Sequence, residues 1–594
     1  MVTELVHVSG GLNASPATRY PLLATGFVVK QFSYTVLATH YSQFCFPHTS
    51  PMTRLIGILL ALALISRPAA AQTSNPVLNH IWSVGMDSSR VQQLAGSLVD
   101  SIGPRLAGSP NVRNGQDWLV SMYKSWGIDA KNERFGTWRS WRRGPSHIDL
   151  ISPRVRTLEG TMLAFSPGTK GKPLVAGTII LPHFDDSTDL ARWLPQAKGK
   201  LVLVSAPPIT CRPISDWTQY ATPESFARMD STRNSRLRDW ANRFNVRGTG
   251  KGLALGGGEL ALELEQAGAA GIVGSRPKDA LGTREIFETN TTRAPNISLS
   301  CEDYGLVYRL TERGNNPKLR LDLESEALGE QPVFNTIATL PGTEKPNEFV
   351  LLSAHFDSWD GSSGATDNGT GTLTMMEAMR ILKQAYPHPK RTIRVGHWTG
   401  EEVGLVGSKA YREDHPEVLA GLQAVFNNDN GTGRIVRMGA TGFPNGDVHA
   451  RKWLQQLPAV FQDQVKYIGV GVPGTGGSDD FSFYCAGAPS FGLGGLNWNY
   501  GNTTWHTDRD TYDKIVFDDL KANATLAAMM AYLASEDPDK VTREQVDLAV
   551  IADSINKANA MLPPPAQGAP QRIPPMTTWP ACGTAPRKTL PRLR

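Results

Sequence analysis

Several apolar segments of this chain end directly on histidines or acidic residues. The segment FVLLSA is followed by His355, TIRVGHW by Thr399-Gly400-Glu401-Glu402, and LQAVFNN by Asp429. In an open α/β sheet, ligands bind in the crevice beyond the carboxyl ends of the strands. The pattern therefore predicts an α/β fold with a site at one edge of the sheet, to which several strands contribute imidazoles and carboxylates.

The side chains of this candidate site are typical of a metal centre. They are two histidines and four carboxylates: His355, Asp367, Glu401, Glu402, Asp429 and His506. Mixed imidazole and carboxylate ligands suit zinc, although cobalt or manganese could also bind them. Two divalent metals about 3.5–4 Å apart lower the pKa of a bridging water to about 7, which generates hydroxide for hydrolysis. Five of the six side chains would be ligands, and one carboxylate would remain for proton transfer.

The adjacent acids Glu401 and Glu402 fit this division of roles. Consecutive residues at a strand-to-helix turn point in different directions, so one can bind a metal while the other acts as general base. A simpler interpretation is that both acids favour the start of a helix. Likewise, Asp367 could be a turn residue or a helix cap, and His506 an ordinary loop residue. The joint occurrence of these elements, and none of them singly, indicates the metal site.

The length and composition indicate an ordinary globular protein of more than one domain. The 594 residues exceed what one core supports, and 40% are hydrophobic and 19% charged. The net charge of +5 is spread without a basic run, which gives no indication of nucleic acid binding. We expect a catalytic domain at 75–158 and 318–540, an insert at 159–317, and a Pro-rich, largely disordered tail at 541–594.

The N-terminal region contains a secretory signal peptide well inside the chain. Residues 52–71 combine Arg54, an apolar run from Leu55 to Ile65, and the small residues Ala69 to Ala71. The run of about 11 residues is too short to span a bilayer, although an uncleaved anchor is the competing interpretation. We expect residues 1–51 to be a non-native, disordered upstream extension. The mature protein would be secreted or periplasmic, without stable membrane association.

The five cysteines are widely spaced and never form a CxxC pair, which excludes a zinc ribbon and a disulfide scaffold. Cys45 lies in the upstream extension. The other four could form disulfides in an exported protein, and the sequence leaves their pairing open: Cys211, Cys301, Cys485 and Cys582.

Over roughly residues 95–535 the chain resembles the secreted dinuclear-zinc exopeptidases, a family that includes carboxypeptidase Q and bacterial leucyl aminopeptidases. The stretches that carry the resemblance are GPRLAGSP, HFDSWDGSSGATDNGTGT, RTIRVGHWTGEEVGLVGSKAY, FNNDNGTG and WHTDRDT. The resemblance implies a mixed, mostly parallel central sheet flanked by helices. It also implies that the insert is a smaller, β-rich protease-associated domain beside the active-site cleft.

The same resemblance implies two zinc ions per chain and assigns their ligands. Asp367 would bridge the two ions, His355 and Asp429 would complete one site, and Glu402 and His506 would complete the other.

Two further roles and one backbone feature follow from the resemblance. Glu401 would be the general base, and the Asp357 carboxylate would orient the His355 imidazole, an arrangement common around metal ligands. The peptide bond Asp367-Asn368 would be cis.

The resemblance also has departures. Asp480 stands where many relatives have a histidine, and the pocket would be lined by Gly474–Gly477 and by Gly492–Tyr500 with Trp498 and Tyr500.

The implied function is an exported metallo-exopeptidase that hydrolyses short peptides or dipeptides by means of a metal-bridging hydroxide. The sequence leaves open whether it is an aminopeptidase or a carboxypeptidase-like dipeptidase, and also its oligomeric state. One alternative is a single-zinc acyltransferase similar to glutaminyl cyclase, and another is a non-catalytic binding protein on the same fold. Metal stoichiometry separates them: two equivalents favour the peptidase, one the cyclase and none the binding protein.

Overall fold

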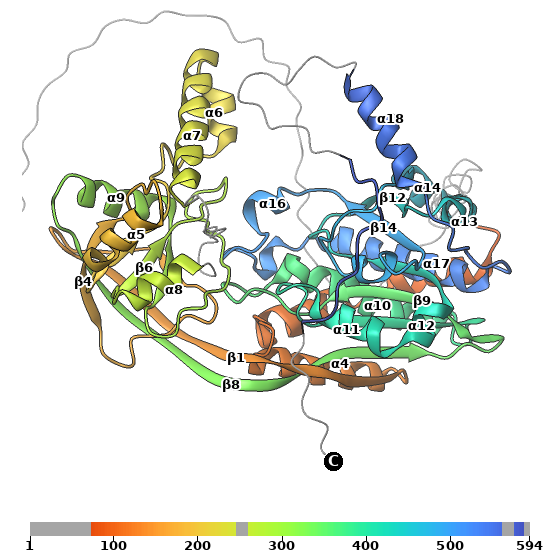
Figure 1. The fold of residues 1–594 in the computed structure, drawn as a ribbon. Coiled ribbons are helices and arrows are strands. Elements are labelled where there is room, and N and C mark those ends of the chain that lie inside the picture. Colours follow the sequence, from red (N-terminus) through yellow and green to blue (C-terminus); the bar gives the residue numbers. More distant parts are fainter. Residues whose placement is uncertain (1–72, 245–258, 561–574, 587–594) are drawn as a thin grey trace, which may run out of the picture. The chain divides into compact units, whose positions relative to one another are not determined.

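The computed structural model of the protein describes residues 73–244, 259–560 and 575–586 (Figure 1). A mixed β-sheet forms the centre of the catalytic part, with the strand order β13-β12-β14-β11-β9-β10-β8. Strands β10, β9, β11 and β14 are mutually parallel neighbours, whereas β12 pairs antiparallel with β14 and β8 antiparallel with β10. The strands are β8 (Lys318–Leu340), β9 (Lys345–His355), β10 (Arg391–Trp398), β11 (Leu422–Asn427), β12 (Ile435–Thr441), β13 (Lys466–Gly471) and β14 (Ser490–Gly495).

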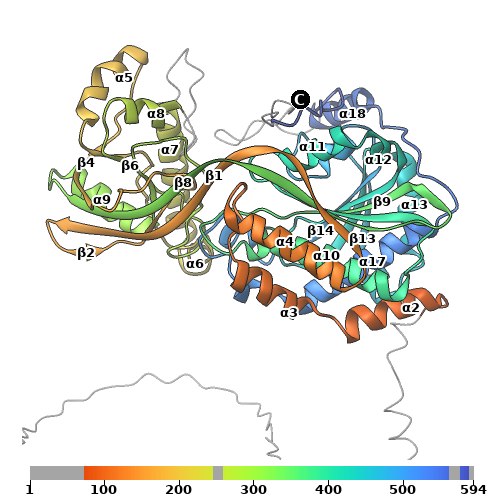
Figure 2. The same ribbon diagram turned by 90° about the horizontal axis from the view of Figure 1, so that it is seen from below.

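Helices cover both faces of this sheet, as expected for parallel strands that are buried on both sides (Figure 2). Alternate residues of β9 point to opposite faces: Val350 and Leu352 join one apolar core, and Phe349 and Leu351 join another. The first core is covered by α2 (Pro76–Trp82), α3 (Val91–Ala95), α4 (Pro110–Ser125), α10 (Thr370–Ala385) and α17 (Phe517–Glu536). The second is covered by α11 (Val406–Asp414) and α12 (Pro416–Gly421).

Three short helices connect the later strands: α13 (Pro444–Leu454), α14 (Ala459–Gln464) and α15 (Phe481–Tyr484). Helix α16 (Tyr500–Thr503) follows β14. In the part of the chain that the structure describes, every helix is too short or too polar to cross a lipid bilayer.

The insert has its own apolar core and contains helices as well as the strands that led us to expect a β-rich domain. Its short strands are β3 (Gly160–Met162), β4 (Leu174–Ile180), β5 (Leu201–Leu203), β6 (Gly271–Gly274) and β7 (Asn296–Leu299). Its helices are α5 (Ser187–Trp193), α6 (Ile214–Tyr220), α7 (Pro223–Phe244), α8 (Glu259–Gln266) and α9 (Cys301–Glu312).

Two long strands belong to both parts. β1 (Asp129–Ser152) pairs antiparallel with β8 along nearly its whole length, and its far end also pairs with the two-residue β2 (Arg156–Thr157) (Figure 1). The first residues of β8 pair with β4 of the insert, and its last residues pair with β10 of the catalytic sheet. The proposed domain boundaries at 159 and 317 therefore fall at the ends of strands that the two parts share.

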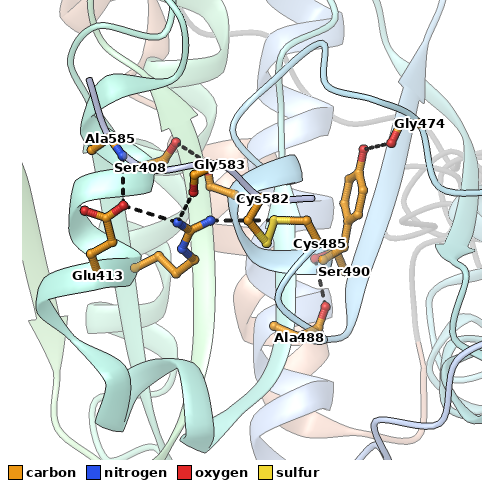
Figure 3. The surroundings of a disulfide bond; sticks show 12 residues. Ser408, Glu413, Gly474, Cys485, Ala488, Ser490, Cys582, Gly583 and Ala585 are labelled. Atoms are coloured by element: carbon orange, nitrogen blue, oxygen red, sulfur yellow. Dashed lines mark hydrogen bonds and ion pairs between the residues drawn. A yellow bond between two sulfur atoms is a disulfide. The ribbon is translucent and has the colours of Figure 1, made fainter. Parts of the chain in front are cut away.

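The C-terminal segment differs from our expectation of a largely disordered tail. Helix α18 (Leu548–Ala560) follows the catalytic part. Residues 575–586 are bound to the catalytic part itself. Cys582 forms a disulfide with Cys485, and the amide of Ala585 donates to Glu413 Oε1 at 2.8 Å (Figure 3). The Pro-rich composition that suggested disorder lies mainly in 561–574, which is outside the described residues, as are the predicted upstream extension and signal peptide.

The four cysteines whose pairing the sequence left open form two disulfides. Cys211 pairs with Cys301 within the insert, and Cys485 pairs with Cys582 across a sequence separation of 97 residues.

Substituting Cys582 with Ser should lower the free energy of unfolding by about 2–4 kcal/mol, because the disulfide restricts the unfolded chain. Urea unfolding followed by circular dichroism would measure this loss. The Cys485→Ser variant and the double variant should lose the same amount, since each removes the same covalent bond. An unchanged urea midpoint in all three variants would contradict the assigned pairing.

Candidate metal centre

The six candidate side chains lie at one edge of the sheet, some at the carboxyl ends of strands and others on loops. His355 is the last residue of β9, Glu401 and Glu402 follow β10, and Asp429 follows β11. Asp367 precedes α10. His506 lies in the loop after α16. Because β10, β9 and β11 are adjacent and parallel, their ends bring these residues to one edge of the sheet.

The structure brings five of these residues into two overlapping groups. His355 Nε2 lies 3.3 Å from Asp367 Oδ1 and 3.4 Å from Asp429 Oδ1. His506 Nε2 lies 3.3 Å from Asp367 Oδ2 and 3.0 Å from Glu402 Oε2. Within each group the candidate ligand atoms lie within 4.8 Å of one another. Asp367 belongs to both groups and presents a different oxygen to each.

The chemistry of these groups fits divalent cations. Two of the buried carboxylate oxygens, Asp367 Oδ2 and Glu402 Oε1, make no hydrogen bond within the described residues, although buried polar atoms are rarely left unpartnered. Buried carboxylates so close together repel one another unless positive charge offsets them. The donor set of imidazole and carboxylate also matches zinc. The residues present therefore fit a pair of metal ions.

Burial and mutual repulsion shift the acids of the centre toward protonation. Burial raises the pKa of Glu401 well above its usual range, and the charges of Asp429 and Glu402 add to this effect. Burial likewise raises the pKa of Glu402 to about 7, with a further contribution from Asp367. Cations bound among these carboxyls would offset the repulsion and favour their ionised forms, as a ligand and a general base both require.

Asp357 contacts the centre in a different way from the one we predicted. The Nδ1–H of His355 donates to the main-chain carbonyl of Asp357 at 2.9 Å, whereas the carboxylate oxygen Oδ1 is 3.8 Å from that nitrogen. The carboxylate instead accepts from the main-chain N–H of Glu401 at 3.2 Å. The turn after β9 thus orients His355 through the backbone, and the Asp357 side chain fixes the start of the Glu401 turn.

The backbone around Asp367 is held by an acid that our sequence analysis did not single out. Asp510 accepts from the N–H of Asp367 at 2.9 Å and from the N–H and hydroxyl of Thr366 at 2.8 and 2.7 Å. The peptide bond between Asp367 and Asn368 is cis, as the resemblance implied. The signal for Asp510 in the sequence was its place in WHTDRDT, four residues after His506.

A buried arginine organises the loop between His355 and Asp367. The fully buried Arg105 donates to the carbonyls of Phe356 at 2.7 Å, Gly103 at 3.0 Å, Ser363 at 2.8 Å and Gly364 at 2.8 Å. Sequence reasoning used its motif, GPRLAGSP, only as part of the family resemblance. The structure gives this motif a physical role, because one guanidinium satisfies several carbonyls of a loop that carries no regular hydrogen bonding.

Of the aromatic residues expected to line the pocket, Tyr500 lies near the candidate ligands and Trp498 does not. Burial raises the pKa of Tyr500 well above its usual range, and the negative charges of Asp367 and Asp429 add to this effect. Trp498 is 57% exposed, and its indole N–H donates to Asp519 Oδ2 of α17 at 2.9 Å. Burial raises the pKa of Asp480, which stands at the family's histidine position, to about 7. Tyr500 therefore lies beside the candidate ligands, whereas Trp498 is bound elsewhere.

Aromatic side chains surround His506, and one of them comes from the insert. The Trp505 ring stacks on His506 with a centroid distance of 3.8 Å, and Phe287 and Trp359 contact it edge-on at 5.0 and 6.0 Å. The N–H of Ile286 donates to the carbonyl of His506 at 2.7 Å. The insert therefore contacts a candidate ligand directly.

A buried histidine beneath the centre should make stability depend on pH. His397 on β10 is fully buried against the Tyr123 hydroxyl, and burial lowers its pKa to about 3. The unfolded chain takes up this proton below about pH 6.5, whereas the folded protein does so only near pH 3. The neutral His397 therefore contributes its full share to the free energy of unfolding above about pH 6.5. As the pH falls from there toward 3, the free energy of unfolding should decrease by about 1.4 kcal/mol per pH unit.

Urea midpoints between pH 5 and 7 would measure this contribution, with His397→Phe as the comparison. The variant should show a flatter dependence on pH, because it removes the titrating group. Equal slopes in both proteins would contradict the assignment.

An α/β sheet with overlapping imidazole and carboxylate groups at one edge is an arrangement that metal-dependent hydrolases use. The model of peptidase family M28 matches residues 335–531, so this part of the chain is an M28 peptidase domain and the protein is a hydrolase. The match confirms the predicted family.

Known sequences and structures resemble the chain over most of its length. Carboxypeptidase Q of Bos taurus is 26% identical over 414 residues, which cover 67% of this chain and 80% of the relative. Carboxypeptidase Q of Mus musculus is 24% identical and covers 77% and 88%. The fold is similar to that of a peptidase M28 precursor from Shewanella amazonensis, with a TM-score of 0.58, 24% identity and coverage of 78% and 97%.

A zinc aminopeptidase from Bacillus subtilis, BSAP, also shares the fold, with a TM-score of 0.50, 20% identity and coverage of 77% and 96%. These similarities confirm the predicted fold class, a mixed central sheet flanked by helices.

Proposed function

We propose that the protein is an exported exopeptidase that uses two zinc ions to hydrolyse short peptides or dipeptides. One observation carries this proposal: two histidine–carboxylate groups share Asp367 and lie at the ends of adjacent strands. Asp367 would bridge the ions, with His355 and Asp429 on one side and Glu402 and His506 on the other. The carboxypeptidase Q relatives and the zinc aminopeptidase of similar fold support a peptide substrate and zinc.

The residues of the chain divide the chemistry between them. When bound, a zinc pair activates a water between the ions and polarises the carbonyl of the scissile bond. Glu401 takes no part in either candidate ligand group, so its carboxylate remains available to accept the proton of the water and deliver it to the leaving amine. Its main-chain N–H is fixed by the Asp357 carboxylate, which keeps the turn that carries Glu401 in place.

Two observations bear on export and on the alternative functions. The disulfides Cys211–Cys301 and Cys485–Cys582 suit an oxidising compartment outside the cytosol. Two candidate ligand groups favour the two-metal peptidase over a single-zinc cyclase, and the retained ligands disfavour a non-catalytic binding protein.

A panel of end-labelled peptides, incubated with the purified protein, tests this function. We expect release of single residues from one terminus, loss of this activity with a chelator, and recovery on addition of zinc. Zinc analysis of the purified protein should give about two equivalents per chain. Cleavage within long peptides, or activity that persists in chelator, would contradict the proposal.

A further inference from the structure

The insert contains a cavity whose walls are rich in positive charge. The cavity has a volume of about 690 Å³ and lies between the loop 204–212, helix α7 and the segment 275–279. This size falls within the range of roughly 300–1,000 Å³ that is typical of small-molecule sites. Its cationic lining residues are Arg212, Arg233, Arg236, Arg276 and Lys278, compared with two acids, Asp279 and Glu285.

The two acids leave part of this positive charge uncompensated. Asp279 Oδ1 accepts from the main-chain N–H of Ile214 at 2.6 Å. Glu285 pairs with both Arg276, whose Nε lies 3.0 Å from Oε2, and Lys278. One carboxylate thus faces two cations on this wall of the cavity.

The opposite wall, on α7, adds two arginines, Arg233 and Arg236. Among the side chains that the structure describes, neither forms an ion pair with a carboxylate, and Arg236 donates to the carbonyl of Pro207 at 3.4 Å. A cavity with such an excess of guanidinium and ammonium groups favours an anionic ligand.

The cavity begins next to the candidate metal ligand His506. Lys278 Nζ lies 4.5 Å from the centroid of the Trp505 ring, which stacks on His506. The Arg276 guanidinium lies 4.3 Å from the centroid of Phe287, which contacts His506 from the other side. A single aromatic side chain therefore separates each of these cations from the imidazole of His506.

We propose that this cavity is a substrate subsite that binds a carboxylate of the peptide whose scissile bond lies at the metal centre. Arg276 and Lys278 would contact the carboxylate, and the α7 arginines would add attraction from the facing wall. Guanidinium groups bind carboxylates through charge-assisted hydrogen bonds, which are stronger than neutral ones. This inference rests on the proposed peptidase function and narrows the substrates to short peptides that carry a carboxylate near the scissile bond.

The carboxylate has two possible sources, the C-terminus of the peptide or an acidic side chain. Peptides of one sequence with a free or amidated C-terminus, and with Glu or Gln beside the scissile bond, distinguish them. For the zinc-loaded enzyme we expect kcat/KM to be about 10- to 100-fold higher for the charged member of one pair, as for a lost hydrogen bond to a charged group. The pair that responds identifies the source, and equal rates within both pairs would overturn the proposal.

The double variant Arg233→Gln/Arg236→Gln should reduce this preference, because it lowers kcat/KM for the charged peptide more than for its uncharged partner. Both arginines lie on an exposed helix, so folding should be preserved, and Arg238→Gln on the same helix, outside the cavity, is the matched control. Arg276→Gln should have a larger effect on the preference, with its urea midpoint measured because Glu285 loses a partner. If the double variant slows charged and uncharged peptides equally, the cavity is not the subsite.

Binding of glutarate to the zinc-loaded protein provides a test that does not require hydrolysis. Calorimetry should show weaker binding to the double variant than to the wild type and to Arg238→Gln. Equal binding by all three proteins would overturn the subsite. Conversely, if no peptide is hydrolysed but glutarate binding still depends on the two arginines, the peptidase function has failed and the anion site remains.

Discussion

Glu401→Gln should lower kcat for peptide hydrolysis by about 10²–10⁴-fold while leaving the zinc content unchanged. The amide keeps the shape of the side chain and cannot accept the proton of the attacking water. Glu401 belongs to neither candidate ligand group, so its substitution should not release metal. Steady-state kinetics with a hydrolysed peptide, together with zinc analysis of the same preparation, measures both quantities.

The matched control for this variant is Glu544→Gln, an exposed position after α17 that should behave as the wild type. If Glu401→Gln hydrolyses peptides at the normal rate, Glu401 is not the general base. If it loses zinc instead, Glu401 is a ligand, and Glu402 becomes the candidate base.

Asp367→Asn should reduce the bound zinc from about two equivalents to one or fewer and abolish peptide hydrolysis. Asp367 is the one residue common to both groups, and each of its oxygens faces a different histidine. An amide offers a single oxygen and no negative charge, so it cannot bridge two cations. Zinc content after dialysis and activity at increasing zinc concentrations check this result.

Asp463→Asn, on the exposed surface of α14, is the control for removal of one carboxylate and should retain zinc and activity. Full zinc occupancy in Asp367→Asn would contradict the bridging role. Recovery of full activity at high zinc concentration would also contradict the bridging role. Asp367 would then affect only the affinity for zinc.

The strand ends could be predicted from the sequence because their signal is local. A buried parallel strand is a continuous apolar run, as in the segments before His355 and Asp429, and the next residue must lie at the edge of the sheet. Adjacent strands then place such residues together without any knowledge of loop structure. For this reason the sheet and the placement of His355, Glu402 and Asp429 follow from short apolar runs, whereas Asp367 and His506 lie on loops and were assigned through the family resemblance.

The supporting contacts could not be predicted, because they depend on how distant segments meet. Arg105 satisfies carbonyls some 250 residues later in the chain, and Asp510 binds the backbone of Thr366 and Asp367. Asp357 was expected to contact His355 through its carboxylate, and the local turn placed its carbonyl there instead. These contacts depend on the path of the backbone through the loops, and the identity of a residue does not determine that path.

The contact between the insert and His506 has an evolutionary consequence. Since the N–H of Ile286 binds the carbonyl of His506 and the Phe287 ring packs on its imidazole, the 159–317 segment is not a removable accessory. A shorter ancestor would have needed another partner for this loop, and any lineage that trims the segment must rebuild the wall around that histidine. Diversification of substrate choice is therefore expected to proceed by substitution within the segment rather than by its loss.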